Sequence, residues 1–142
     1  MKINKITVVG DALTVSYTKQ LQEDTESNNI LKTAQSISDA FHDNIEALKP
    51  HVITLLELHP DYSENMTVNS VTFVDRKGSL GVVISVKKVV STSNSPANLH
   101  TPLIFESLQE ELLPSNSMSE GLKVLLRDIL DRTEQYVYEV EG

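Results

Sequence analysis

The spacing of the apolar residues changes along this chain between period two and period three to four, and this change constrains the fold most. Apolar residues alternate with polar or small ones on either side of Gly10 and Asp11, at Ile6, Val8, Leu13, Val15 and Tyr17, which places strands near 3–9 and 12–19. Alternation interrupted by a Gly-Asp pair predicts a β-hairpin. From about residue 38 the spacing becomes that of a helix face, with apolar residues at Phe41, Ile45, Leu48, Val52 and Leu55.

This central helix is expected to be bent. Ser38 or Ser36 can cap its start, and Pro50 falls inside its apolar pattern. Proline lacks a backbone N–H, and its ring clashes with the preceding turn of a helix. We therefore expect a kink, or a break into two short helices, near Lys49.

A second strand pair follows the helix. Val68, Val71 and Phe73 open one strand, and residues 75–78 have the composition of a tight turn that ends in glycine. Residues 82–90 are rich in β-branched side chains and predict the returning strand.

Polar segments separate these elements. Residues 20–29 and 91–98 are expected to form exposed loops. Residues 30–35 suit either a short third strand, which we favour, or the first turns of the helix. Residues 99–105 predict a further strand that Pro102 restricts to an edge of the sheet.

The C-terminal segment predicts a long helix over about 118–138. The run 117–120 (Ser-Met-Ser-Glu) matches a capping box, and an apolar stripe follows it, formed by Leu122, Leu125, Leu126, Ile129, Tyr136 and Val140. The 142 residues are expected to form a single α+β domain over 1–142. Its antiparallel sheet of about five to six strands, with two hairpins, would pack on the kinked central helix and the long C-terminal helix.

Charge is unevenly distributed along the chain. The whole sequence has 12 Lys and Arg against 20 Asp and Glu, a net charge of −8. Residues 66–103 instead carry a net charge of +3, from Arg76, Lys77, Lys87 and Lys88 against Asp75. The acidic total argues against non-specific nucleic-acid binding, because contacts with phosphate supply most of that affinity. The basic middle suggests a place where an anion or a partner could be held.

The residue types that carry chemistry are sparse. The chain has no cysteine, which fits a reducing cytoplasm, and no apolar run long enough to cross a membrane. The histidines at 42, 51, 59 and 100 lack metal-ligand spacing, and the five glycines form no phosphate-binding loop. We therefore expect no catalytic residues, no metal site and no cofactor.

Candidate ligand-binding residues come from two segments. The basic segment supplies Arg76, Lys77 and Lys88, although such residues also serve simply as solubilising side chains. Lys87 and Lys88 are adjacent on one strand and face opposite sides, so at most one of them can join a common site. The second segment, 94–102, is polar and lies between two prolines that stiffen it; it supplies Asn98, His100 and Thr101. This loop would either recognise a ligand or only cover a sheet edge.

Three stretches together resemble a family of small accessory proteins of tailed phages and prophages, mostly without assigned function. They are residues 68–73, residues 81–85 (Gly-Val-Val-Ile-Ser) and residues 98–102 (Asn-Leu-His-Thr-Pro). An amphipathic segment like 47–52 precedes them in that family, and an amphipathic C-terminal helix follows. His100 departs from the family pattern, in which asparagine is more usual. The resemblance implies a phage accessory protein and brings no substrate or catalytic residue.

Three functions fit these observations. The first is a non-catalytic protein in the cytoplasm of an infected bacterium that counteracts or modulates a host system by binding a host protein. Its acidic regions would occupy a basic, nucleic-acid-binding surface of that protein. The alternative is a homo-oligomeric sponge that sequesters a nucleotide-like signalling molecule through the basic residues. An accessory factor in DNA metabolism is a third.

Overall fold

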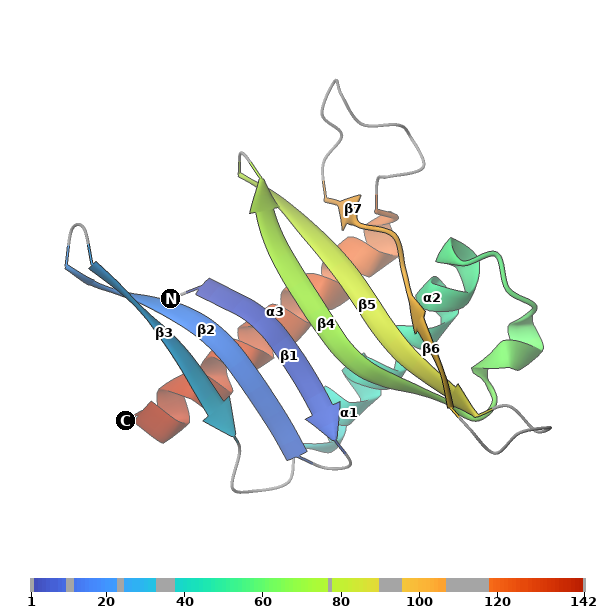
Figure 1. Ribbon diagram of the computed structural model, residues 1–142, viewed down its shortest axis with the longest axis horizontal. Helices are drawn as coiled ribbons and strands as arrows, with labels where there is room; N and C mark the ends of the chain where they lie inside the picture. Colours follow the sequence, from blue (N-terminus) through green and yellow to red (C-terminus); the bar gives the residue numbers. More distant parts are fainter. Residues whose placement is uncertain are drawn as a thin grey trace.

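In the computed structural model the helices lie on one face of an antiparallel sheet (Figure 1). The structure describes residues 2–9, 12–22, 25–32, 38–76, 78–89, 96–106 and 118–141. The described strands are β1 (Lys2–Val9), β2 (Ala12–Gln22), β3 (Thr25–Lys32), β4 (Met66–Arg76), β5 (Ser79–Val89), β6 (Pro96–His100) and β7 (Ile104–Phe105). The described helices are α1 (Asp39–Glu46), α2 (Lys49–Leu55), the short 3-10 helix η1 (Pro60–Ser63) and α3 (Glu120–Glu141).

The sheet joins two meanders. Its strand order is β3-β2-β1-β4-β5-β6, with β7 paired to β5, and every pairing is antiparallel. The two halves meet where β1 pairs with β4. The expected α+β class is confirmed, with an antiparallel sheet packed on a bent helix and a long C-terminal helix. The described part of the chain forms seven strands, one more than the upper end of our range.

The expected loop over residues 20–29 is wrong. β2 continues to Gln22, and β3 starts at Thr25 and pairs with it from Gln22 through Thr14. The segment is polar because β3 is an edge strand, whose backbone hydrogen bonds to β2 need little help from buried side chains. The strand that we favoured for residues 30–35 is found as far as residue 32, and residues 33–35 lie outside the described residues.

The predicted break in the central helix is confirmed. α1 ends at Glu46, and α2 begins at Lys49 with Pro50 in its first turn. A proline is tolerated there because the first backbone N–H groups of a helix have no partner within it. The start of α1 is capped by Ser38, whose Oγ accepts a hydrogen bond from the N–H of Phe41 at 3.2 Å. The alternative cap, Ser36, lies outside the described residues.

The segment after β5 differs from our expectation in two respects. Residues 96–98, placed in a loop, belong to strand β6, and the strand expected over 99–105 is interrupted at 101–103. Pro102 has no N–H to give to a ladder, which accounts for the interruption. The predicted edge position is confirmed, since among the described strands β6 and β7 pair with β5 alone. Residues 91–95 lie outside the described residues.

Of the two predicted turns, the β4–β5 turn can be compared with the structure and the β1–β2 turn cannot. The β4–β5 turn contains Gly78 with φ of +81°, and the Gly78 N–H donates to Oδ1 of Asp75 at 3.1 Å. A positive φ is open to glycine at no steric cost, so glycine is favoured at this position. The β1–β2 turn at Gly10 and Asp11 lies outside the described residues, although the strands expected on either side of it are present.

The last helix starts slightly later than predicted. The described cap is Ser119, whose Oγ accepts from the N–H of Leu122 at 3.3 Å, whereas Ser117 of the proposed capping box lies outside the described residues. The predicted stripe is buried at Leu122, Leu126 and Ile129. It continues through Thr133 and Val137, which are fully buried and which the sequence pattern did not identify.

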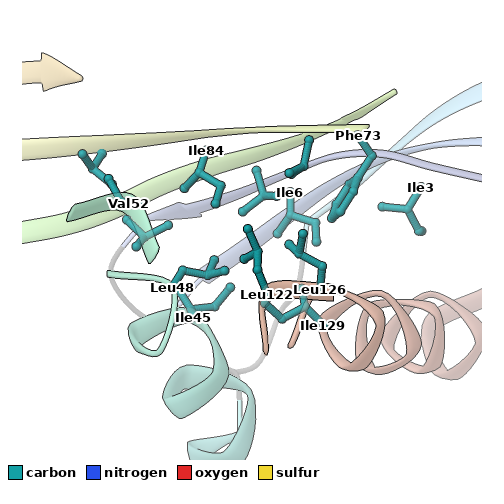
Figure 2. Close-up of a cluster of buried hydrophobic side chains, with 14 of the residues drawn as sticks. Ile3, Ile6, Ile45, Leu48, Val52, Phe73, Ile84, Leu122, Leu126 and Ile129 are labelled. Atoms are coloured by element: carbon teal, nitrogen blue, oxygen red, sulfur yellow. The ribbon is translucent and has the colours of Figure 1, made fainter. Parts of the chain in front are cut away.

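The hydrophobic core lies between the sheet and the helices. Figure 2 shows its side chains pointing from the two layers towards one another: Ile3, Ile6, Phe73 and Ile84 from the sheet, and Ile45, Leu48, Val52, Leu122, Leu126 and Ile129 from the helices. Burying a side chain of this size contributes roughly 1.5–3 kcal/mol relative to leaving it exposed. This one layer of contacts is therefore the main source of stability.

A bidentate ion pair ties the end of β7 to α3. Arg127 donates from Nε and Nη2 to the two carboxylate oxygens of Glu106, at 2.7 and 2.6 Å. The Glu106 N–H in turn donates to the carbonyl oxygen of Leu80 in β5 at 2.7 Å. The hydrogen bonds and charge of Arg127 hold the pKa of Glu106 below its ordinary value. The pair therefore fixes α3 to the part of the sheet where β7 pairs with β5.

Candidate functional site

The sheet has one face that no described element covers, and we call it the outer face (Figure 1). Successive side chains of a strand point to opposite faces. Because Ile6, Val71 and Ile84 are buried towards the helices, their neighbours Thr7 and Ser85 point to the outer face. Among the described residues, this face therefore has no helical cover.

A row of short polar side chains crosses the outer face. Strand register places Thr14 opposite Thr7, Thr7 opposite Ser70, Ser70 opposite Ser85, and Ser85 opposite His100. The row therefore crosses five neighbouring strands, from β2 to β6. It ends in a hydrogen bond of 2.7 Å between Ser85 Oγ and His100 Nδ1. These five residues, which we call the polar row, place hydroxyl groups and one imidazole on this face, and the central one, Ser70, is only 4% exposed.

A shorter polar ladder lies nearer the β3 edge. Asn4 Nδ2 donates to Thr18 Oγ1 at 2.8 Å, and Thr18 Oγ1 donates to Asn28 Oδ1 at 3.1 Å. The ladder links β1, β2 and β3 through side chains. Such cross-strand contacts stabilise the sheet and fix its register.

The charges on the outer face are mostly positive. By strand alternation its described charged residues are Lys2, Lys5, Arg76 and Lys87, with Glu26 as the acidic exception; Lys32 takes an outer-face place in the register. Phe105 also belongs to this face, because its ring would meet a Cβ built on Gly81 at 2.8 Å. The guanidinium of Arg76 lies 5.1 Å from the centre of that ring, a cation–π distance.

The helices on the other side of the sheet have the opposite charge. The described strands carry seven Lys and Arg against two Asp and Glu, a net charge of +5, whereas the described helices carry four against ten, a net charge of −6. The asymmetry seen along the sequence is thus an asymmetry between two layers. It extends beyond the 66–103 segment, since Lys2 and Lys5 of β1 also belong to the basic layer.

The helices α1 and α3 bring acidic residues together. Asn44 Nδ2 donates to Asp128 at 2.8 Å, and the N–H of Ser38 donates to the hydroxyl of Tyr136 at 2.7 Å, so the two helices run antiparallel side by side. The ring of Tyr136 packs edge-on against Phe41 at 5.5 Å. From the exposed carboxylates of these helices we define the acidic layer as Asp39, Asp43, Asp128, Asp131 and Glu139, leaving out Glu120, which is paired with Lys123.

The basic candidates are not brought to one place. Lys88 has the same strand parity as the buried Val86 and lies on the helix side, where its Nζ donates to the carbonyl oxygen of Glu64. Arg76 pairs with Ser79 at the opposite end of β5. Eight residues along a strand, from Ser79 to Lys87, are roughly 26 Å. Lys77 lies outside the described residues.

The candidates of the 94–102 segment have two different environments. Asn98 and His100 are exposed on the outer face, opposite Lys87 and Ser85 respectively. Thr101 is instead buried, and its Oγ1 accepts a hydrogen bond from the N–H of Ile84 at 2.9 Å. Thr101 therefore fixes the end of β6 against β5, and Asn98 and His100 remain available for contact.

Lys87 and Ser85 are the neighbours of Asn98 and His100 that the sequence reasoning did not select. From the sequence alone, Lys87 and Lys88 face opposite sides and Lys88 is the candidate. The signal that could have decided between them is the alternation of the strand itself. Val82, Ile84 and Val86 are the buried set, so Lys88 shares their side, and Lys87 belongs with the polar residues.

The described histidines are not arranged for metal binding, since the described residues contain no group of three or more His, Cys, Asp or Glu able to hold an ion. His51 is partly buried close to Gly121, and burial lowers its pKa below the ordinary value. His59 caps η1, with Nδ1 accepting from the N–H of Asp61 at 3.2 Å.

Two hollows are found on the helix side of the molecule. One, of about 240 Å³, lies between α1 and α3 and is lined by Ser38, Arg132, Gln135, Tyr136 and Glu139. The other, of about 580 Å³, is an open groove along α3 that includes Val124 and Leu125. Both are shallow openings at the surface, so the helix layer offers contact surface more than an enclosed small-molecule site.

None of the described helices combines the length and the apolar character that crossing a bilayer requires. Comparison with known proteins gives no family assignment, because no protein-family model, no curated protein and no solved structure matches this chain.

Proposed function

We propose that this protein is a non-catalytic binding protein whose acidic layer docks on a basic surface of a host protein. The setting is the one that the resemblance implies, a phage or prophage protein acting in the cytoplasm of an infected bacterium. The observation that carries the proposal is the separation of charge between the layers, +5 on the described strands and −6 on the described helices.

Charge gathered on one side of a molecule acts at longer range than scattered charge, and it orients the molecule during encounter. Asp39 and Asp43 are exposed on one helix, and Asp128 and Asp131 are exposed on its neighbour. Asp128 is paired with Arg132 at 3.4 Å, so the negative surface offered to a partner that normally holds a phosphate backbone is carried mainly by Asp39, Asp43 and Asp131. Such a partner would be competed away from its nucleic acid.

A binding role also suits the Ser85–His100 pair. A hydroxyl and an imidazole at 2.7 Å resemble a nucleophile and its base, but such a pair needs a third group to orient the imidazole. Within the described part of the chain, no carboxylate is bonded to His100, and the pair lies on an open face of the sheet. We therefore assign these residues to contact and not to covalent chemistry.

The proposal is tested by retention of host proteins on the immobilised chain at low and at high salt. We expect a host protein to be retained at low salt, released at high salt, and lost when the acidic layer is reversed by Asp39→Lys with Asp43→Lys. The matched control reverses the outer face instead, by Lys5→Glu with Lys87→Glu, and should retain the same protein. Equal retention by the Asp39→Lys, Asp43→Lys chain would contradict the proposal.

The outer face favours a second candidate, the sequestration of a nucleotide-like anion. Lys5 and Lys87 lie on the same face as the hydroxyl groups of the polar row, and together they offer cationic and neutral donors to a phosphate. A thermal-shift screen with cyclic and linear nucleotides tests this candidate, because a tight ligand raises the melting temperature by mass action. Loss of that shift in Lys87→Glu, with Lys88→Ala unaffected, would place the ligand on the outer face.

A further inference from the structure

The two edges of the sheet are protected to different extents. The edge formed by β6 and β7 is short, begins at Pro96 and is interrupted at 101–103. The edge formed by β3 has eight residues without proline or glycine, and no described strand lies beyond it (Figure 1). An uninterrupted edge strand presents a row of backbone donors and acceptors to another strand.

β3 also exposes an apolar side chain. Ile30 is 73% exposed and, as the register partner of Ser16, lies on the outer face. An isoleucine of this exposure in the middle of an edge strand adds apolar surface to be buried when another strand pairs there. The edge therefore offers both backbone hydrogen bonds and a hydrophobic contact.

We propose that β3 pairs antiparallel with β3 of a second copy of this chain, across a two-fold axis at Asn29. In such a dimer the outer faces of the two copies lie on the same side, so a residue of one parity must stand opposite a residue of the same parity. Placing the axis at Asn29 satisfies this condition. It sets Glu26 opposite Lys32 of the second copy and Asn28 opposite Ile30 of the second copy.

Charge selects this register over its neighbours. With the axis at Asn29, both ends of the paired segment bring an acidic residue opposite a basic one, and opposite charges that face each other across a ladder are stabilising. With the axis at Asn28, Glu26 stands opposite Ile30, and with the axis at Ile30, Lys32 stands opposite Asn28, so neither alternative pairs the charges. In the proposed register, Ile30 is also diagonally adjacent to Ile30 of the second copy.

The dimer would join the two sheets into one, with the two outer faces side by side on the same surface. The polar rows and the lysines of both copies would then form a single extended basic face. This inference concerns assembly and stands apart from the proposed function, since the acidic layer is on the opposite side of the sheet.

A single-cysteine variant tests the register, because the natural chain has no cysteine. Asn29→Cys would place the two thiols opposite each other on the axis. Opposed Cα atoms in an antiparallel pair are about 4.5–5.5 Å apart, within the range for a disulfide. The matched control is Ser27→Cys, on the same face of the same strand, whose two copies would be more than about 13 Å apart. We expect mild oxidation to give a covalent dimer with Asn29→Cys and not with Ser27→Cys.

Charge exchange gives an independent measurement. Glu26 and Lys32 are six residues apart in one strand, about 20 Å, so they have no direct interaction within a copy. We expect Glu26→Lys and Lys32→Glu each to weaken dimerisation about tenfold in sedimentation velocity, and the double exchange to restore it. Circular dichroism of each variant confirms that it is folded.

Three results would overturn the proposal. The first is a wild-type chain that remains monomeric at every concentration tested. The second is a dimer that neither single charge reversal weakens, since it would use another surface. The third is equal disulfide formation by Asn29→Cys and Ser27→Cys, which would show that β3 meets its partner in another register or only by collision.

Discussion

The two faces of the sheet are built on the same strands, but one carries buried apolar side chains and the other carries polar ones. On the helix side Ile6, Val71 and Ile84 are buried. Thr7 and Ser85, which follow Ile6 and Ile84 in the sequence, lie on the outer face. Alternation along a strand thus separates the groups that stabilise the fold from the groups available for contact. Substitutions at residues adjacent in sequence should consequently differ sharply in how much they lower the free energy of unfolding.

The layers differ in charge as well as in polarity. The described helices, which cover one face of the sheet, carry a negative net charge. The described strands carry a positive net charge. A molecule charged in this way could contact a basic partner from its helix side and an acidic partner from its outer face. Mutations on the two sides separate stability from recognition.

The largest expected effect comes from the core. Leu126 is fully buried between α3 and the sheet, whereas Val124, on the same helix, is 70% exposed. Leu126→Ala should lower the free energy of unfolding by about 2–5 kcal/mol, because it leaves a cavity, and Val124→Ala by less than about 0.5 kcal/mol. Urea denaturation measures both, and similar costs would show that α3 does not pack as described.

A smaller effect is expected from a tightly packed place on the outer face. Gly81→Ala would put a methyl group 2.8 Å from Cε1 of Phe105, which is itself only 1% exposed. Overpacking of this kind costs about 1–3 kcal/mol of unfolding free energy. In a Phe105→Ala background the cost of Gly81→Ala should fall, since only the contact with Leu103 Cδ1 at 3.2 Å would remain close. An undiminished cost there would rule out the ring as its source.

The ion pair between Glu106 and Arg127 should make a modest contribution that depends on pH. The folded-state pKa of Glu106 lies below its ordinary value, so the stabilisation is present above the ordinary value of 4.5 and is lost as the pH falls through the folded-state value. Glu106→Gln should cost up to about 1 kcal/mol at neutral pH, since the pair is partly exposed. At strongly acidic pH the variant and the wild type should be equally stable. Glu139→Gln, on an exposed part of α3, is the control and should cost less than about 0.5 kcal/mol at neutral pH.

The smallest effect separates two adjacent lysines. Lys88 donates to the carbonyl oxygen of Glu64 on the helix side, and Lys87 is exposed on the outer face. Lys88→Ala should cost about 0.5–1 kcal/mol of unfolding free energy, and Lys87→Ala less than about 0.5 kcal/mol. Thermal unfolding of both variants measures these costs. A larger cost for Lys87→Ala than for Lys88→Ala would mean that the assignment of these two residues to the faces is wrong.

Much of the fold could be predicted from local patterns. The period-two segments, the break at Pro50, the cap at Ser38 and the glycine of the β4–β5 turn each depend on residues close in sequence, and each is found. Most of β3 could not be predicted in this way, although a strand was expected from residue 30. Residues 25–29 are polar, and they form a strand because β2 supplies the hydrogen bonds.

The candidate surfaces were harder to predict than the fold. The sequence indicated that Lys87 and Lys88 face opposite sides, and the alternation of Val82, Ile84 and Val86 could also have placed Lys88 on the buried side. It also separated His100 from Ser85 by fifteen positions, and the structure joins them in one hydrogen bond. The polar row depends on four strand pairings at once, so no local pattern could reveal it.

The sequence by itself determined the types of most elements, the α+β class and the uneven charge, because propensity, periodicity and capping act over a few residues. Only the tertiary structure decided which side of the sheet the helices cover and which side chains meet across strands. Register between strands is set by long-range pairing, such as that of Ile6 with Val71, and such pairing is not encoded in any single segment.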